Sequence, residues 1–330
     1  MKRQFLCGLI VLSAVYGIRA AEKESTRQEQ AVVEFEKIGA IVETDADDSA
    51  KPVISVDFRD TNVTNENLKY LEDVPHLRTL ILADTRITDA GLTHLKDLIE
   101  LEVLDLGDTH VTDAALDYLK RLTKLNSLDL YDTHISDAGL EQLKNLIELK
   151  ALDLGDTHVT GTGLVHLKTL KNLEILELGD TAVTDAGLEH IAELTGLRDL
   201  GLYDTEVTDI GLKHLKKLKE LESLVLGGTR VSDNGLEAIA DLVNLQVLDL
   251  SDTQISNAGL KQFKNLKQLR TLDLSGNILV TDEGLRQLEN LQDLEELYVM
   301  HTQVTEAGAR RLRRKLPNVT IQITDEGPEA

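Results

Sequence analysis

Cysteine is almost absent from this 330-residue sequence. The single cysteine, Cys7, lies in the apolar segment at the amino terminus. If that segment is removed, the mature chain has no thiol, which excludes disulfides, thiol catalysis and thiolate zinc sites. Aromatic residues are scarce, at 3% with no tryptophan, and the formal net charge is -23. Nucleic acid and anionic membranes are therefore poor partners, because they attract basic surfaces and, in the case of single strands, stacking rings.

The first 20 residues have the pattern of a secretory signal peptide. Lys2 and Arg3 precede an apolar run from Phe5 to Ile18, which is too short to span a bilayer, and small residues follow it. We expect cleavage after Ala20, with an uncleaved anchor as the alternative. No later segment is long and apolar enough to cross a membrane, so the expected location is secreted, or periplasmic and within the cell envelope.

A 24-residue period organises the chain from residue 53 onward. Eleven copies follow one another, and the last begins at Leu294 because the copy before it is one residue longer. The consensus LxxLxLxDTxVTDxGLxxLxxLxx begins with alternating apolar residues, which predict a short strand. It continues with apolar residues at every third position, which predict a helical turn. Residues such as Thr112 and Asp113 offer side-chain oxygens where that turn needs an N-cap.

This pattern resembles the leucine-rich repeat family, and within it the cysteine-containing class, with threonine where that class has cysteine. The resemblance covers residues 53 to about 323. It implies an α/β solenoid, or horseshoe, with parallel strands on the concave face and short helices on the convex face. It also implies a recognition scaffold. A single repeat cannot bury both its strand and its helix leucines, but stacked repeats share a continuous core.

Four segments are expected: a signal peptide over 1–20, an N-terminal cap over 21–52, eleven repeats over 53–318, and a terminal strand with a disordered tail over 319–330. In the cap, Ala31, Val32, Phe35 and Ile38 share one helical face, and Gly39 suits the end of that helix. Residues 40–44 predict a strand. Such a cap covers the open end of the array.

Two acidic stripes recur at positions expected to line the inner face or its edge, where neighbouring rungs lie about 4.8 Å apart. The aspartate before the threonine column, as in Asp108, is nearly constant and is expected to bond turn amides, while the threonines bond backbone groups. The residue between the two strand leucines has no such expected backbone role. This mid-strand stripe is therefore the candidate for partner binding, with simple solubility as the alternative.

The candidate partner-binding residues combine the mid-strand stripe with tyrosines expected to face the same way, since tyrosine is a common interface anchor. They are Asp105, Asp129, Asp153, Glu177, Tyr131, Tyr203, Asp249, Asp273 and Tyr298. The negative stripe favours a protein partner with a basic surface. The solenoid itself is expected to be a monomer.

Histidines form a third column, with His110, His134 and His158 at equivalent positions of three successive repeats. They could bind a transition metal, but non-ligand residues continue the column, so an ordinary surface column is favoured and no metal or cofactor is expected. The sequence has no Gly-rich phosphate loop, GxSxG elbow or HExxH motif, and we expect no enzymatic activity. Two alternatives remain open: a cation-dependent or enzymatic site on the stacked Asp and His columns, and a structural component of the envelope or matrix.

Overall fold

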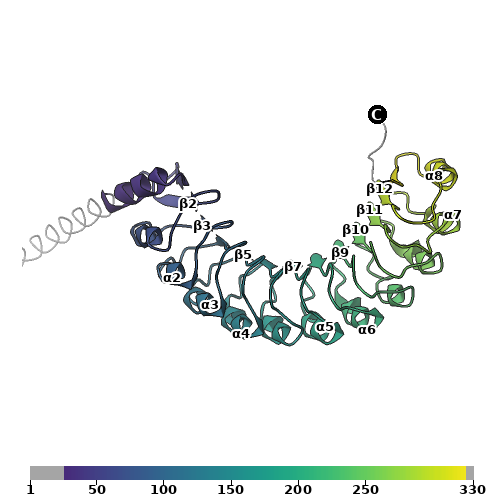
Figure 1. The fold of residues 1–330 in the computed structure, drawn as a ribbon, viewed down its shortest axis with the longest axis horizontal. Coiled ribbons are helices and arrows are strands. Elements are labelled where there is room, and N and C mark those ends of the chain that lie inside the picture. The colour runs from purple at the N-terminus through teal and green to yellow at the C-terminus, as the bar shows by residue number, and fades with distance from the viewer. Residues whose placement is uncertain (1–25, 325–330) are drawn as a thin grey trace, which may run out of the picture.

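The protein is described by a computed structural model, which covers residues 26–324. Thirteen strands form one open sheet in chain order, and the sheet curves into an arc with strands inside and helices outside (Figure 1). The expected α/β solenoid is confirmed. The signal-peptide segment and residues 325–330 lie outside the described residues.

Each repeat contributes one short strand to the sheet, and the central residue of every strand from β3 to β12 is a buried leucine. β1 is antiparallel to β2, and every later pair is parallel and in register. The strands are β1 (Ile41–Thr44), β2 (Val53–Asp57), β3 (Thr79–Ile81), β4 (Val103–Asp105), β5 (Ser127–Asp129), β6 (Ala151–Asp153), β7 (Ile175–Glu177), β8 (Asp199–Gly201), β9 (Ser223–Val225), β10 (Val247–Asp249), β11 (Thr271–Asp273), β12 (Glu296–Tyr298) and β13 (Thr320–Gln322).

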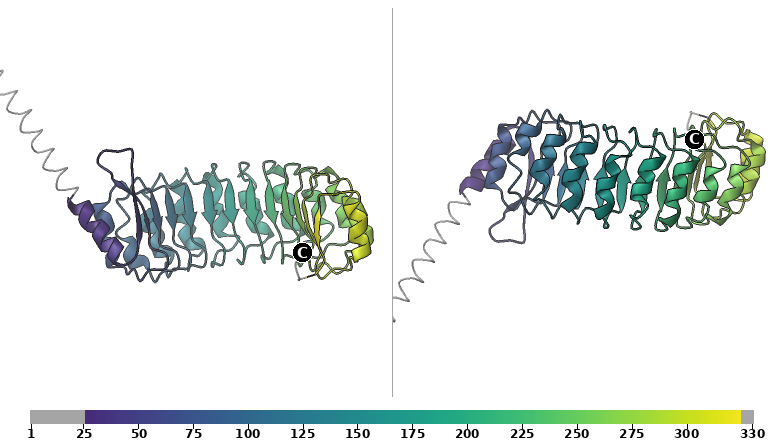
Figure 2. Two further views of the ribbon diagram at one scale, coloured as in Figure 1. Left: turned by 90° about the horizontal axis from the view of Figure 1, so that it is seen from above. Right: turned by 90° about the horizontal axis from the view of Figure 1, so that it is seen from below.

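The outer side carries α-helices in some repeats and 3-10 helices in others, ranged side by side along the array (Figure 2). Segments this short often tighten to i to i+3 hydrogen bonds. The α-helices are an N-terminal helix (residues 26–37), α2 (Asp89–Leu92), α3 (Asp113–Leu119), α4 (Asp137–Leu140), α5 (Asp185–Ile191), α6 (Asp209–Leu212), α7 (Asp282–Leu285) and α8 (Glu306–Arg313). The 3-10 helices are η1 (Asn67–Asp73), η2 (Glu141–Asn145), η3 (Gly163–Thr169), η4 (Lys213–Lys217), η5 (Gly235–Ala238), η6 (Gly259–Asn265) and η7 (Arg286–Leu288).

The core is a continuous column of leucines between the sheet and the outer helices. In the repeat that contains β4, Leu101, Leu104, Leu106, Leu116 and Leu119 are all completely buried. Each such side chain stabilises the fold by roughly 1.5–3 kcal/mol, so the leucine columns dominate its stability.

The N-terminal helix covers the first repeat. Ala31 and Phe35 are completely buried, and the Phe35 ring meets the Phe58 ring edge-on at 5.3 Å between centroids. Val32 and Ile38 pack partly buried against the same core. Gly39 then ends the helix with φ +92°, a conformation that suits glycine.

The threonine column forms the predicted side-chain to backbone bonds. In almost every repeat the hydroxyl donates to the carbonyl three residues earlier, as Thr109 does to Leu106 at 2.6 Å. Asn277 takes this position once, where it is buried and binds the carbonyl of Leu250 in the preceding repeat at 2.7 Å. These bonds satisfy carbonyl groups that the tight turn would otherwise leave buried without a donor.

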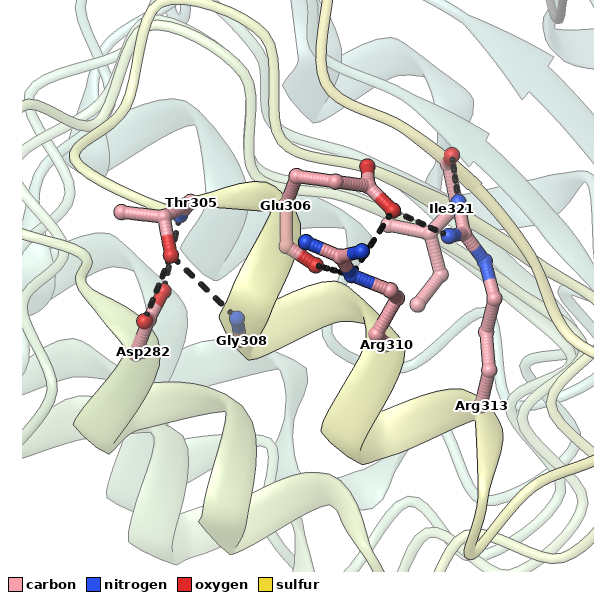
Figure 3. Close-up of polar contacts among 7 residues, drawn as sticks. All are labelled: Asp282, Thr305, Glu306, Gly308, Arg310, Arg313 and Ile321. Carbon is pink, nitrogen blue, oxygen red and sulfur yellow. Dashed lines mark hydrogen bonds and ion pairs between the residues drawn. The ribbon is translucent and has the colours of Figure 1, made fainter.

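A second ladder of hydrogen bonds links neighbouring repeats at the helix starts. At most joints an aspartate at the helix start accepts from both the backbone N–H and the hydroxyl of a Thr or Ser in the next repeat. Asp209 binds Ser232 in this way at 2.7 and 2.6 Å, and Asp282 binds Thr305 at 2.8 Å for both donors (Figure 3). Asn65 and Asn257 take the place of the aspartate at two joints, where the side-chain oxygen accepts the N–H and the amide donates to the hydroxyl. The expected N-caps are therefore only half of the arrangement. The threonine accepts a hydrogen bond from its own helix, while the aspartate accepts hydrogen bonds from the next repeat.

This ladder has one gap, at Gly161, which supplies no carboxylate to Thr184 in the next repeat. The two repeats instead approach closely there, and a Cβ on Gly161 would lie 2.8 Å from the amide nitrogen of Gly187. Backbone contact thus replaces the carboxylate bonds at this one joint.

Replacing Asp209 with alanine should destabilise the solenoid by about 1–3 kcal/mol, because Ser232 would lose an acceptor for both its amide and its hydroxyl. The measurement is the free energy of unfolding in urea. Asp241→Ala, at an exposed convex loop, is the matched control and should leave the transition unchanged. Coincident transitions for the two variants would show that the ladder does not contribute to stability.

Candidate functional site

The parallel register brings four of the predicted residues into one line. Asp105 on β4 lies opposite Asp129 on β5, which lies opposite Asp153 on β6, which lies opposite Glu177 on β7. We call these four residues the acidic strip. It runs across four adjacent strands without interruption, in the register that the repeat predicted.

The other mid-strand candidates form a separate group. Asp249, Asp273 and Tyr298 follow one another in register on β10, β11 and β12. Gly201 and Val225 occupy the same position on β8 and β9 and divide this group from the acidic strip. The nine candidate residues therefore do not make one continuous surface.

The aspartates of the mid-strand stripe are the last residues of their strands in the structure, and they have a backbone role that sequence reasoning denied them. Asp105, Asp129 and Asp153 each accept a hydrogen bond from the backbone N–H two residues later, at 3.1, 2.9 and 2.8 Å. Asp249 and Asp273 do the same at 2.8 and 2.7 Å. Aspartate is thus required partly by the turn that follows each strand, and charge alone does not explain the stripe.

For the aspartates before the threonine column, the structure gives a different reason for the residue type than the sequence suggested. We expected them to bond turn amides, but their distinguishing feature is a left-handed backbone, with φ 53° at Asp108 and 45° at Asp132. Aspartate tolerates this conformation better than most residues, and glycine tolerates it best. Gly228 and Gly276 stand at the same repeat position with φ +71° and +75°, and their presence in the sequence is the signal that was overlooked.

Three members of the acidic strip, Asp105, Asp153 and Glu177, have raised pKa values and so resist ionisation. Partial burial raises the pKa of Asp105, and the charge of Asp129 adds to this, although the Gly107 N–H opposes it. Burial also raises the pKa of Asp153. The hydrogen bond from the Gly155 N–H lowers it, and the charge of Asp129 raises it further. The strip is therefore a place where a cation from another molecule would relieve an existing cost.

Glu177 is the extreme member of the strip. Burial, with the charges of Asp153 and Asp199, raises its pKa to about 7. The glycine beside it on β8 explains its position, because a Cβ on Gly201 would lie 1.5 Å from the Glu177 Oε2. The side chain of Glu177 therefore lies across the next strand, in space that any larger residue would fill.

Two of the three candidate tyrosines, Tyr131 and Tyr203, lie in the turns that follow β5 and β8, two residues after the last strand residue. Tyr131 is 41% exposed and Tyr203 is 44% exposed. Each ring lies beside a glycine of the next repeat, since a Cβ on Gly155 would be 3.1 Å from Tyr131 Cδ2 and one on Gly227 would be 3.1 Å from Tyr203 Cδ2. Tyr298 differs, because its hydroxyl donates to Glu296 at 3.1 Å.

Sequence reasoning missed a second column on the same face. Residues one and three of a strand point to the same side, so the first strand residue lies beside the mid-strand stripe. Along the acidic strip this column is uncharged, and Ile175 is 39% exposed. From β3 to β8 it reads Thr79, Val103, Ser127, Ala151, Ile175 and Asp199. The period-two rule applied to LxxLxL would have revealed it.

The histidine column lies on the surface beside these strands. The rings of His110 and His134 are 6.4 Å apart between centroids, and those of His134 and His158 are 6.0 Å apart. Within residues 26–324, no group of three or more His, Cys, Asp or Glu side chains is arranged to hold a metal ion.

Comparison with known families agrees with this architecture. Two models of the leucine-rich repeat match the chain, one over residues 219–279 and 243–304 and the other over 75–96, 121–144 and 169–192. The chain belongs to the leucine-rich repeat family. No curated protein matches it in sequence.

Solved structures share the fold. An internalin (inlF) from Listeria monocytogenes superposes with a TM-score of 0.59 at 23% identity, over 86% of this chain and 92% of the internalin chain. The ectodomain of the Arabidopsis receptor kinase HAESA, in complex with an IDA peptide hormone ligand, gives 0.66 at 18% identity, over 93% of this chain and 53% of its own. A Leptospira interrogans leucine-rich repeat protein gives 0.50 at 19%, over 77% and 80%.

Among the helices that the structure describes, none has the length and apolar character of a membrane span.

The carboxyl group of Glu177 should titrate near pH 7, well above its ordinary value of 4.5. Because its pKa is raised on folding, the native state binds this proton more tightly than the unfolded state. Stability should therefore fall as the pH rises from about 4.5 to about 7. Carbon-detected NMR of the side-chain carboxyl measures the midpoint, and Glu177→Gln should gain stability relative to wild type between pH 5 and pH 8.

Glu148→Gln is the control for this prediction, since Glu148 is exposed on a convex loop. The stability of Glu148→Gln should stay equal to that of wild type between pH 5 and pH 8. A Glu177 midpoint near 4.5 would mean that the side chain does not lie across Gly201 in solution.

Proposed function

We propose that this leucine-rich repeat protein is a non-enzymatic recognition scaffold that binds a protein partner with a basic surface along the acidic strip. The observation that carries the proposal is the unbroken register of Asp105, Asp129, Asp153 and Glu177 on four adjacent strands. Like charges about 5 Å apart repel by roughly 0.8–3 kcal/mol per pair at effective dielectric constants between 80 and 20. A row of Lys or Arg side chains would convert that repulsion into attraction.

The surroundings of the strip suit an extended or helical segment of polypeptide. The uncharged column beside it, with Ala151 and the exposed Ile175, offers apolar contact along the same strands. Tyr131 and Tyr203 add exposed rings that can pack on aliphatic stems or on guanidinium groups. The HAESA ectodomain shows that this fold can hold a peptide ligand.

We further propose that the protein acts outside the cytoplasm. The support is the signal-peptide pattern of residues 1–20, with its basic start and short apolar run. A partner that is a protein of the cell surface or of the extracellular medium is consistent with this location.

Removing the charge of the strip should weaken binding of a basic probe without unfolding the protein. The variant is Asp105→Asn, Asp129→Asn, Asp153→Asn and Glu177→Gln. Asparagine keeps an oxygen that accepts the turn N–H, whereas lysine or alanine would remove it. With a fluorescent oligo-arginine peptide as the probe, anisotropy should show at least about a tenfold loss of affinity, which corresponds to ~1.4 kcal/mol. Wild-type binding should weaken as salt rises.

The matched control removes the same number of formal charges from exposed loops that follow the outer helices, with Glu148→Gln, Glu220→Gln, Asp241→Asn and Asp293→Asn. Its net charge equals that of the strip variant, so general attraction to an acidic protein is held constant. Equal loss of affinity in both variants would overturn a specific role for the concave face.

A further inference from the structure

The last helix and the turn after it carry a dense cluster of positive charge within a strongly acidic chain. Residues 306–324 contain five basic residues and one acidic residue, in a chain with a net charge of -23. Four of the five are exposed, and we call them the basic patch: Arg310, Arg311, Arg314 and Lys315.

The fifth, Arg313, has a structural role. Its Nη1 pairs with Glu306 at 3.0 Å, and its Nη2 donates to the carbonyl of Ile321 on β13 at 3.1 Å (Figure 3). Because Thr320 and Gln322 make the bonds to β12, Ile321 turns its carbonyl toward the open edge of the sheet. Arg313 therefore covers an edge that could otherwise pair with another strand.

The basic patch has no comparable internal use. Glu306 lies 3.7 Å from Arg310, but Arg311, Arg314 and Lys315 form no ion pair with any residue between 26 and 324. Cations near a helix C-terminus stabilise the helix dipole. One or two are enough for that, and α3 has none in its last turn.

The position of α8 leaves the patch available to another molecule. It is the final helix of the array and packs beside α7, at the tip of the arc in Figure 1. The apolar residues Ala309, Leu312 and Leu316 are buried in the core, and the small Ala307 is the exposed apolar residue of the helix. The exposed face of the helix is therefore charged and lacks the apolar anchors with which a surface helix enters a bilayer.

We propose that the basic patch of one copy docks onto the acidic strip of a second copy. This inference rests on the proposed function, because it names a partner for the same concave strip. The chain itself supplies both halves of a complementary pair: four consecutive carboxylates on β4–β7, and four exposed cations at the end of α8.

The two surfaces cannot meet within one chain. β13 is separated from β7 by five strands and from β4 by eight, so the gap is about 30–45 Å along the sheet at roughly 4.8 Å per strand. The helices also lie on the outer side and the strip on the inner side of an array held by a continuous core (Figure 2). Contact between them therefore requires two molecules.

The spacings of the two surfaces correspond. Arg310 and Arg311 lie on α8, and Arg314 and Lys315 lie in the turn that directly follows it, where the Leu316 N–H still bonds the Leu312 carbonyl. Residues four apart on such a helical path, Arg310 with Arg314 and Arg311 with Lys315, lie about 5–6 Å apart. The carboxylates recur about every 4.8 Å along the strip. Guanidinium groups bind carboxylates with two parallel hydrogen bonds, and three of the four cations are arginine.

Such a contact joins different surfaces of the two copies, so each dimer leaves one patch and one strip free. The charge of -23 on every copy opposes association at a distance, while salt screens charges beyond about 8–10 Å. We therefore expect weak, concentration-dependent and salt-sensitive self-association. This departs from the expectation of a monomer that the sequence alone supported.

Sedimentation velocity over a wide concentration range tests the proposal. Wild type should shift toward dimers as concentration rises, and the helix-reversed variant, Arg311→Glu, Arg314→Glu and Lys315→Glu, should stay monomeric. The strip-reversed variant, Asp105→Lys, Asp129→Lys and Asp153→Lys, should also stay monomeric. A mixture of the two reversed variants should associate again, because each supplies the charge that the other lacks. Circular dichroism of each variant checks its folding.

Three results would overturn the proposal. One is a wild type that stays monomeric at every concentration, and another is unchanged association in the helix-reversed variant. The third is a loss of association in the helix-reversed variant alone, with no recovery in the mixture. That result would mean that the patch binds a surface of the second copy other than the acidic strip.

The oligo-arginine probe separates this inference from the proposed function. If the probe binds the strip while copies remain monomeric, the strip recognises a basic partner other than a second copy. If the patch instead binds inorganic polyphosphate without self-association, its partner is a polyanion and the inference is wrong.

Discussion

The spacing between neighbouring strands is the constraint on which the rest of this protein depends. Buried leucines on the sheet and on the outer helices hold the repeats in parallel register at about 4.8 Å. That single repeat distance aligns the threonine and aspartate hydrogen-bond ladders. It also forces four acidic side chains, from Asp105 to Glu177, into a line closer than isolated carboxylates would adopt.

The acidic strip shows how one residue type can serve folding and recognition together. The carboxylate of Asp129 accepts the Tyr131 N–H and so completes the turn after its strand, while its charge remains on the concave face. Glu177 has no bond of this kind and relies on the absence of a side chain at Gly201. The core supplies enough stability to tolerate the repulsion, and that repulsion is what a basic partner would relieve.

The two ends of the array are closed by different means. At the start, an amphipathic helix buries Phe35 against Phe58, and β1 adds an antiparallel strand to the sheet. At the end, the guanidinium of Arg313 covers the Ile321 carbonyl, and Arg311, Arg314 and Lys315 form no ion pair within residues 26–324. The sequence alone shows that the last helix is basic. Only the position of that helix at the end of the array shows that its basic side chains are available to another molecule.

The 24-residue period was enough to predict the solenoid, its leucine core and the threonine bonds, because one repeat buries both its strand and its helix leucines only by stacking on its neighbours. The same period predicted the line of acids from Asp105 to Glu177, since equivalent residues must become neighbours. Only the tertiary structure decided which aspartates bond the turns, since a backbone with φ near +50° at Asp108 and Asp156 is set by the whole rung. It also decided that the Asp209 carboxylate bonds the next repeat and that Glu177 lies across Gly201. These contacts join atoms 23 or 24 residues apart, so no local pattern could specify their geometry.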